Sequence, residues 1–291
     1  MTNAACRRGN KLIFFGLIGL LWLVANLGQP AWGMPQQRIV SLAPALTELL
    51  FALGFDEQIV GVSAFCDHPS QARQRPSVGG MANPSLEAIV ALKPDLVVMT
   101  TDGNSRETAE RLEAFGIRTL IFRTRRLLEM PAAFQVFGEQ LGVPGAANAL
   151  AQDLQNSFTT YAAAAAHSSA DKRKALFVIW PEPLVVAGPA TLIDDALTLL
   201  GVDNIAADTA VAYPRFSLEE ALRRAPQVVI FGSGRGMEQQ AEGLLQQFST
   251  LPSAQNLSVC FVGDALYRSG PRLGEGLAEL VKCLTPRDEA P

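Results

Sequence analysis

Four stretches of the sequence carry side chains that could bind a ligand or take part in chemistry. They are residues 65–69 (FCDHP), 79–81 (GGM), 212–214 (AYP) and 264–269 (DALYRS). Aromatic and apolar side chains accompanied by a few polar groups suit a large, partly hydrophobic ligand. Taken singly, each aromatic is better explained by core packing, and Asp264 could simply pair with Arg268 one turn away. The four stretches therefore matter for function only if the fold brings them together.

Signatures of catalysis are few. The sequence has no Gly-x-Ser-x-Gly element and no Walker loop. Residues 232–236 (GSGRG) follow a predicted strand, but their third glycine comes one residue too early for a dinucleotide-binding loop, which favours a flexible loop beside a cleft. Cys66 with His68 is the pair of residues that would support an enzyme. We predict no catalytic residue, and we keep an enzyme built on that pair as the alternative.

A resident metal site is not expected either. The chain has two histidines, His68 and His167, whereas a transition-metal site needs several ligands that converge on one point. Cys66, Asp67 and His68 are adjacent in the sequence, and adjacent residues rarely point at one centre. We therefore predict neither a metal site nor a cofactor of the protein's own.

Residues 1–33 have the features of a signal peptide. Arg7, Arg8 and Lys11 precede an apolar run over residues 12–27, and small residues follow, so we expect cleavage after Gly33. A retained membrane anchor is the alternative, but the run is shorter than the roughly 20 residues that span a membrane. Removing residues 1–33 leaves a net charge of −7, because three basic residues and no acidic ones are lost. That charge argues against nucleic acid or an anionic membrane as partner. We expect an exported, periplasmic protein.

Three cysteines remain after residue 33. Export permits a disulfide. Cys260 lies in a predicted strand and Cys283 lies near the end of the helix that follows, so the two could meet if the helix packs back onto its strand. Cys66 would then stay unpaired. Three buried free thiols are the alternative, and the sequence leaves the choice open.

Predicted strands and helices alternate along the chain, which is typical of an α/β fold with largely parallel sheets. Between two such regions, residues 144–167 are rich in Ala, Gln and Leu and have no proline after Pro144. Consecutive alanines favour a rigid helix there over a flexible linker. We predict four parts: a signal peptide at 1–33, an N-terminal α/β lobe at 34–143, a connecting backbone helix at 144–170 and a C-terminal α/β lobe at 171–291.

An internal repeat relates the two predicted lobes. Residues 85–87 (SLE) and 217–219 (SLE) each precede a proline, Pro94 or Pro226, by the same spacing, and an apolar strand follows each proline. Such a repeat predicts two similar lobes on either side of the long helix. Parallel sheets bind ligands beyond the carboxyl ends of their strands, so we expect the ligand in a cleft between the lobes.

The N-terminal lobe resembles a known family of transport proteins. The resemblance rests on residues 38–44 (RIVSLAP), 60–62 (VGV) and 91–96 (ALKPDL), with isolated matches at Thr47, Glu48, Gly54, Asp67, Pro69, Leu86 and Glu87. In the second lobe it rests on Tyr213, Pro214, Ser217, Glu219, Ala225, Pro226, Asp264, Arg268, Pro271 and Arg272. These residues are similar to those of the helical-backbone substrate-binding proteins of ABC importers, and among them most similar to the periplasmic cobalamin receptors.

The resemblance implies two Rossmann-like lobes joined by one long helix, and a monomer that delivers a small-molecule ligand to a permease dimer in the inner membrane. A glutamate on each lobe of these receptors docks onto permease arginines. The matching positions are Glu87 and Glu219, which the internal repeat also aligns. Their alternative role is to stabilise helix dipoles as solvent-facing acids in a first turn.

The resemblance also implies a ligand set, with a cobalt corrinoid as the ligand. We predict contacts from Ala43, Pro44, Ala45, Phe65, Met81, Tyr213, Asp264, Tyr267 and Arg268. The match is incomplete, because Tyr213, Met81 and Thr100 stand where cobalamin receptors carry Trp. Leu200 likewise replaces the cysteine that often bridges to the position of Cys283. Another corrinoid, haem or a ferric siderophore remains open as ligand, as does a periplasmic tetrapyrrole-modifying enzyme.

Overall fold

A computed structural model describes residues 37–167, 172–234, 237–249 and 257–285. The predicted signal peptide, residues 1–33, lies outside the described residues. From Arg38 onward the chain forms one compact unit. Within the described part, no helix combines the length and the apolar character that a membrane crossing requires.

Lobe 1 is the part of this unit built on the first sheet. Its four parallel strands follow the order β2-β1-β3-β4. The two central strands are fully buried over residues 39–41 and 96–99, which fits their mostly apolar sequences, with Ser41 as the one polar residue in these two ranges. The elements are β1 (Ile39–Ser41), α2 (Pro44–Ala52), β2 (Ile59–Val62), η1 (Ser70–Gln74), α3 (Leu86–Ala91), β3 (Leu96–Thr100), α4 (Arg106–Ala114) and β4 (Arg118–Phe122).

Lobe 2 is built on the second sheet, whose order is β6-β5-β8-β9, with β7 parallel to the start of β5. β6 is the antiparallel member. Cys260 of β9 and Cys283 of α10 form a disulfide, with their Cα atoms 5.8 Å apart. The elements are β5 (Lys174–Trp180), β6 (Val185–Val186), α7 (Leu192–Leu199), β7 (Asp203–Asn204), α8 (Leu218–Arg223), β8 (Val228–Gly232), α9 (Met237–Ser249), β9 (Ser258–Val262), η4 (Asp264–Leu266) and α10 (Leu273–Leu284).

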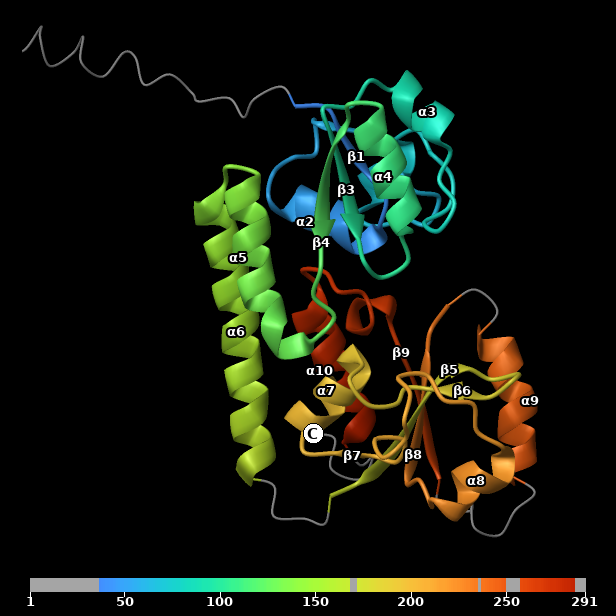
Figure 1. Ribbon diagram of the computed structural model, residues 1–291. Coiled ribbons are helices and arrows are strands. Elements are labelled where there is room, and N and C mark those ends of the chain that lie inside the picture. The colour runs from blue at the N-terminus through green and yellow to red at the C-terminus, as the bar shows by residue number, and fades with distance from the viewer. Residues whose placement is uncertain (1–36, 168–171, 235–236, 250–256, 286–291) are drawn as a thin grey trace, which may run out of the picture. The chain divides into compact units, whose positions relative to one another are not determined.

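A helical spine connects the two lobes: η2 (Leu127–Glu129), α5 (Met130–Gln140) and the 24-residue α6 (Pro144–His167). α5 and α6 run side by side (Figure 1) and approach so closely at Gly138 and Ala147 that Gly138 has no room for a β-carbon. The ring of Phe122, at the end of β4, packs against Phe134 and Phe137 of α5. At its other end α6 contacts α7 and α10 of lobe 2. This arrangement confirms the predicted α/β fold with one long helix, whereas the exact limits of the lobes stay a prediction.

The internal repeat is visible in the backbone of both lobes. The Ser85 and Ser217 hydroxyls cap α3 and α8 in the same way, each accepting a hydrogen bond of 3.1 Å from the backbone N–H three residues on. Lys93 and Ala225 each adopt a positive φ, 47° and 50°, immediately before a proline. That conformation costs a non-glycine residue about 1–2 kcal/mol, so its recurrence marks a matched helix–strand connection.

Candidate functional site

In lobe 1 the predicted apolar ligand contacts come together at the carboxyl edge of the sheet. Phe65 follows β2, and its side chain is 60% exposed. Gly80 passes beside that ring, since a β-carbon on Gly80 would lie 3.9 Å from Phe65 Cε2. Met81 packs against Gly103, and the Asn104 side chain donates a 2.8 Å hydrogen bond to the Met81 carbonyl. Loops after two strands thus form one apolar surface.

The segment after β1 contributes differently from what we expected. Ala43 and Pro44 are buried, whereas Ala45 is partly exposed. The Ala45 backbone lies against Gly270 of lobe 2, where a β-carbon would come within 3.5 Å of Ala45 and 3.3 Å of Glu48 Oε2. These residues therefore shape the closest approach of the lobes.

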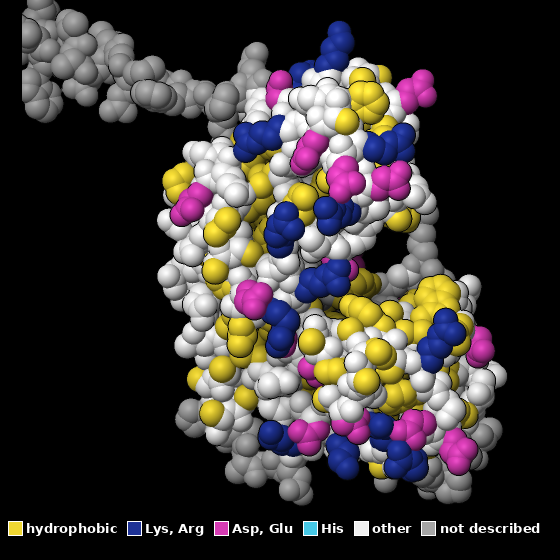
Figure 2. All heavy atoms as spheres, in the orientation of Figure 1, with side chains coloured by type: hydrophobic (Ala, Val, Ile, Leu, Met, Phe, Trp, Pro, Cys, Tyr) yellow, Lys and Arg dark blue, Asp and Glu magenta, His cyan; other side chains and the backbone are white. Residues whose placement is uncertain are grey.

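Three aromatic side chains lie at the facing loops of lobe 2. Tyr267 packs on Gly232 at the end of β8, and its hydroxyl donates to the Ser233 carbonyl at 2.6 Å. Trp180 ends β5 with 45% of its surface exposed, and its Nε1–H donates to the Glu182 carbonyl at 2.8 Å. Tyr213 is 53% exposed. Since the strands are parallel, Trp180 and Tyr267 share the carboxyl edge of the sheet, and Figure 2 shows the surface hollowed between the lobes.

Tyr213 lies within electrostatic range of two charged residues on the lobe 1 side, Asp102 and Arg125. Partial burial raises the pKa of its hydroxyl, the charge of Asp102 raises it further, and the charge of Arg125 lowers it. Arg125 lies 3.5 Å from Asp102 and donates to the Thr101 carbonyl at 2.6 Å. The segments that follow β3 and β4 thus contribute opposite charges to the surroundings of Tyr213.

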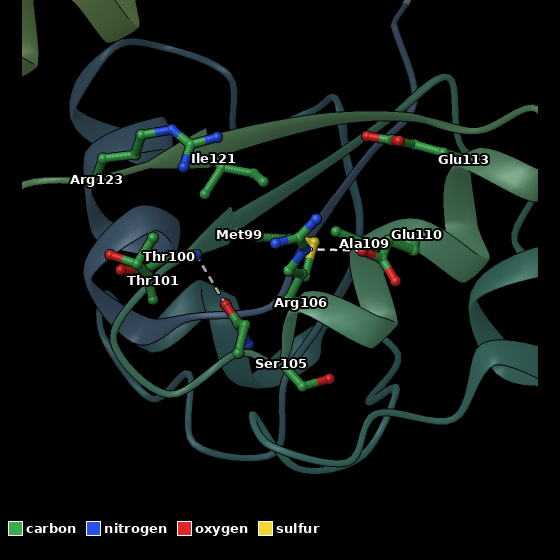
Figure 3. A pocket seen from close by; sticks show the side chains of 11 residues that line it. Met99, Thr100, Thr101, Ser105, Arg106, Ala109, Glu110, Glu113, Ile121 and Arg123 are labelled. Carbon is green, nitrogen blue, oxygen red and sulfur yellow. Dashed lines mark hydrogen bonds and ion pairs between the residues drawn. The ribbon is translucent and has the colours of Figure 1, made fainter.

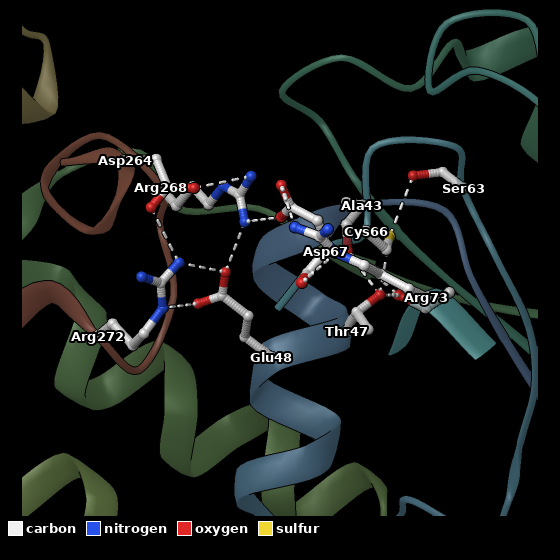
Figure 4. Close-up of polar contacts among 11 residues, drawn as sticks. Ala43, Thr47, Glu48, Ser63, Cys66, Asp67, Arg73, Asp264, Arg268 and Arg272 are labelled. Atoms are coloured by element: carbon white, nitrogen blue, oxygen red, sulfur yellow. Dashed lines mark hydrogen bonds and ion pairs between the residues drawn. The ribbon is translucent and has the colours of Figure 1, made fainter. Parts of the chain in front are cut away.

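Five charged residues form what we call the inter-lobe ion cluster: Glu48 and Asp67 of lobe 1 with Asp264, Arg268 and Arg272 of lobe 2 (Figure 4). Arg272 grips the Glu48 carboxylate with Nε at 2.9 Å and Nη2 at 2.8 Å. Arg268 reaches Glu48 at 2.9 Å, Asp67 at 2.8 Å and Asp264 at 2.9 Å. The side chain of Glu48 is only 1% exposed. The predicted Asp264–Arg268 pair exists, but it belongs to a larger network across the lobes.

The ion pairs of the cluster keep Arg272 and Asp67 in their charged forms. The hydrogen bond to Glu48 is the main cause that raises the pKa of Arg272. Burial raises the pKa of Asp67, but the hydrogen bond and the charge of Arg268 lower it more, so the net shift is downward. Asp67 therefore stays ionised at neutral pH. Glu48 and Arg272 were noticed in the sequence only as family matches, because partners more than 200 residues apart leave no local pattern.

Cys66, which precedes Asp67 of this cluster, is a buried free thiol. The Thr47 hydroxyl donates to its sulfur at 3.0 Å, and the Ser63 hydroxyl lies 3.1 Å from it. Burial raises the pKa of the Cys66 thiol, which disfavours the thiolate that a nucleophile requires. Cys66 and His68 share no hydrogen bond in the described structure, and His68 is exposed. This geometry gives no support to the enzyme alternative.

Metal-binding groups are also sparse. No three His, Cys, Asp or Glu side chains among the described residues are grouped so that they could hold a metal ion. A pocket of about 620 Å³ lies in lobe 1 between β4 and α4, where Arg106 and Arg123 approach from opposite walls (Figure 3). Arg106 already pairs with Glu110 at 2.8 Å. This pocket was not predicted, and none of the predicted ligand contacts lines it.

The two predicted docking glutamates occupy equivalent places. Glu87 and Glu219 are each the second residue of their six-residue helices, α3 and α8, and both are exposed. Neither forms an ion pair with another described residue, whereas the adjacent Glu220 is held by Arg223 and Arg224 at 2.8 and 2.6 Å. Glu87 and Glu219 therefore present free carboxylates at matched positions.

A second ion pair between the spine and lobe 2 was not foreseen. Arg126 donates to the Asp195 carboxylate from Nε at 2.8 Å and from Nη2 at 2.6 Å. The Leu127 backbone N–H adds a third hydrogen bond at 3.0 Å. The Asp195 side chain is 11% exposed. This pair anchors the segment that leaves β4 onto α7.

Known proteins match this chain over most of its length. Residues 39–258 match the family described as periplasmic binding protein. A vitamin B12-binding protein of Pectobacterium atrosepticum is 32% identical over 260 residues, which cover 87% of this chain and 90% of that protein. Another, from Salmonella typhimurium, is 33% identical over 227 residues, which cover 78% and 82%. The family resemblance seen in the sequence is thus confirmed.

Solved structures match as well. The periplasmic vitamin B12 binding protein of Vibrio cholerae superposes with a TM-score of 0.74 and 26% identity, covering 85% of this chain and 96% of that one. A periplasmic heme binding protein from Pseudomonas aeruginosa superposes with a TM-score of 0.74 and 28% identity, covering 86% and 93%.

Proposed function

This chain belongs to the periplasmic binding protein family, and from that premise we propose that it is the substrate-binding component of an ABC importer that captures a corrinoid between its lobes. One observation carries the proposal. Exposed aromatic side chains stand at the facing edges of both sheets, namely Phe65 in lobe 1 and Trp180, Tyr213 and Tyr267 in lobe 2, with the partly exposed Met81 beside the Phe65 loop. A flat macrocycle can lie against such rings, and the relatives named above are vitamin B12-binding proteins.

The polar groups beside these rings suit the rim of a corrinoid. A corrin ring carries amide side chains, which both donate and accept hydrogen bonds. The Nε–H of Arg268 has no close partner among the described residues, and Oδ2 of the half-exposed Asp67 carboxylate is paired only loosely, with Arg73 at 4.0 Å. Donors and acceptors therefore stand side by side near Tyr267, which matches an amide rim better than a purely apolar cleft would.

The spine limits how far the lobes can move. α6 packs on α5 beside lobe 1 and on α7 and α10 of lobe 2. The Arg126–Asp195 pair adds a tie where the chain leaves lobe 1 after β4. We infer that ligand capture involves a small closing motion rather than a wide hinge. Glu87 and Glu219, free and equivalent, would then present the loaded protein to the permease. Residues 1–33 would direct export, and the mature protein would act as a monomer in the periplasm.

Titration with cyanocobalamin tests the proposal. Trp180 is the sole tryptophan after residue 33 and stands half-exposed at the end of β5, so ligand beside it should quench its fluorescence. Saturable quenching at micromolar ligand or below, together with coelution of the coloured complex, is the expected result. Failure to bind cyanocobalamin and other corrinoids would overturn the ligand assignment.

Haem is the second candidate, and one observation favours it. The heme binding protein from Pseudomonas aeruginosa shares 28% identity with this chain and the same fold. Haem carries two carboxylates, whereas the arginines of the inter-lobe ion cluster are already paired with carboxylates. A parallel titration with haemin decides between them, and we expect the weaker binding for haemin.

A further inference from the structure

The inter-lobe ion cluster places a buried charge where the lobes meet. Glu48 projects from α2 of lobe 1, and its carboxylate is contacted by both Arg268 and Arg272 of lobe 2. A carboxylate with 1% exposure is unfavourable unless its hydrogen bonds are satisfied. Both oxygens accept guanidinium hydrogen bonds here, at 2.8 to 2.9 Å. Glu48 therefore ties α2 of lobe 1 to the loop of lobe 2 that carries Arg268 and Arg272.

Arg268 connects this contact between the lobes to the loops that carry the predicted ligand contacts. One of its nitrogens, Nη1, donates to Glu48 and to Asp67, and Nη2 pairs with Asp264. Asp67 follows Phe65 by two residues, and Asp264 precedes Tyr267 by three. The loops that carry the two aromatic side chains thus converge on one guanidinium, whose orientation is set from beneath by Glu48.

Gly270 allows this convergence. Its Cα approaches α2 so closely that a β-carbon would lie 3.3 Å from Glu48 Oε2. Arg268 and Arg272 flank Gly270 in the sequence, so both reach the same carboxylate from one turn of chain. The arrangement is a built contact that involves a helix of one lobe and a tight loop of the other.

We propose that Glu48 is a positioning residue for ligand binding: it acts through Arg268 to fix the Phe65 loop and the Tyr267 loop against each other across the cleft. The inference rests on the proposed function for its ligand, but its structural part does not. Removing the charge of Glu48 should release both loops together, although they belong to different lobes and neither contains Glu48.

The chain offers a matched control. Asp195 is also a mostly buried carboxylate that accepts two guanidinium hydrogen bonds across elements, from Arg126. It lies outside the inter-lobe ion cluster. Asp195→Asn therefore removes a comparable tie without touching Arg268. A general loosening of the protein would affect both variants alike, whereas positioning through Arg268 would affect Glu48→Gln alone.

The experiment compares Glu48→Gln, Asp195→Asn, Arg268→Gln and the double variant Glu48→Gln/Arg268→Gln in the full mature protein. Cyanocobalamin affinity should fall about tenfold or more for Glu48→Gln and by less than about twofold for Asp195→Asn. In the Arg268→Gln background, Glu48→Gln should cause little further loss, because the effect passes through Arg268. Equal, additive losses in both backgrounds would overturn the proposal.

Amide hydrogen exchange of the ligand-free protein provides a readout that needs no ligand. Glu48→Gln should speed exchange in residues 63–69 and 264–272 together, while Asp195→Asn leaves both segments unchanged. Unchanged exchange in either segment for Glu48→Gln would refute the positioning role. If the parent protein binds no corrinoid, the proposed ligand fails, and the exchange result alone decides the role of Glu48.

Discussion

The two lobes share their backbone features but differ in the charged side chains on the edges that face each other. Each has a central parallel sheet, a serine-capped six-residue helix, and a left-handed residue before a proline. Their facing edges differ in charge: in the inter-lobe ion cluster lobe 1 contributes only the acids Glu48 and Asp67, whereas lobe 2 contributes Arg268 and Arg272 together with Asp264. Backbone geometry has thus been kept in both copies, while the loops at the facing edge have become complementary. A repeat in sequence identifies the scaffold and says little about the site.

The helices α3 and α8 are, in contrast, alike in the acidic residue that each one exposes. Glu87 and Glu219 are matched in residue type, position in the helix and exposure. A partner that is itself a dimer can use two equivalent contacts. The lobes are therefore alike where we propose that the permease binds and unlike where we propose that the ligand binds.

The largest expected effect concerns the docking glutamates. Glu87→Ala with Glu219→Ala should abolish ligand transport into cells while leaving cyanocobalamin affinity unchanged, because both side chains lie in α3 and α8 and contact none of the predicted ligand residues. Each single variant should lose transport to a similar extent if the lobes dock equivalently. Uptake of labelled ligand checks this, and Glu220→Ala is the control. Normal uptake by the double variant would contradict the assignment.

Arg272→Ala tests the complementary edge. It removes two of the guanidinium hydrogen bonds to the buried Glu48 carboxylate, and leaving a buried charge without its partner costs about 3–5 kcal/mol. Since Arg268 still contacts Glu48, we expect a loss of about 3 kcal/mol in the free energy of unfolding, measured by urea denaturation. Arg73→Ala is the control, because the Arg73 side chain is 67% exposed and lies 4.0 Å from Asp67. Equal losses in the two variants would argue against the cluster as a structural tie.

The serine caps test whether the scaffolds are equivalent in energy as well as in geometry. Ser85→Ala and Ser217→Ala each remove one hydrogen bond from a backbone N–H to a side-chain oxygen. Each should lower the free energy of unfolding by about 1 kcal/mol. Thermal unfolding of both variants checks this, with Ser→Gly at each position expected to cost less. A large difference between the two would show that the repeat is geometric only.

The sequence predicted the parts of the molecule that depend on local patterns. Strand and helix alternation, the long alanine-rich helix and the SLE repeat each have a short-range signature, and the fold carries all of them. The inter-lobe ion cluster has no such signature. Glu48 and Arg272 are 224 residues apart, and only the packing of two lobes makes them neighbours.

The candidate ligand residues show the same limit. Three of the predicted ligand contacts, Phe65, Tyr213 and Tyr267, are aromatic residues in loops, and all three are exposed. The resemblance also predicts contacts from Ala43 and Pro44, but both are buried in the structure, because the helix start that they form packs into lobe 1. A sequence match identifies a shared backbone position, and the exposure of its side chain depends on what packs around it.

The smallest expected effect is a pH dependence at the exposed end of the cluster. Burial raises the pKa of Asp67, but Arg268 lowers it by more than burial raises it. The carboxylate of the folded protein therefore binds a proton less readily than that of the unfolded chain, whose pKa lies near 3.8. The Asp67–Arg268 contact therefore adds stability above about pH 4, and this stability is lost as the pH falls through the lowered folded pKa. Asp67→Asn should shrink the drop in melting temperature on acidification below pH 4, by a small amount because the Asp67 side chain is 46% exposed. Asp102→Asn is the control, because the 3.5 Å pair between Asp102 and Arg125 joins two residues of the lobe 1 side. Parallel melting curves for Asp67→Asn and the parent protein across this range would show that Asp67 adds no pH-dependent tie between the lobes.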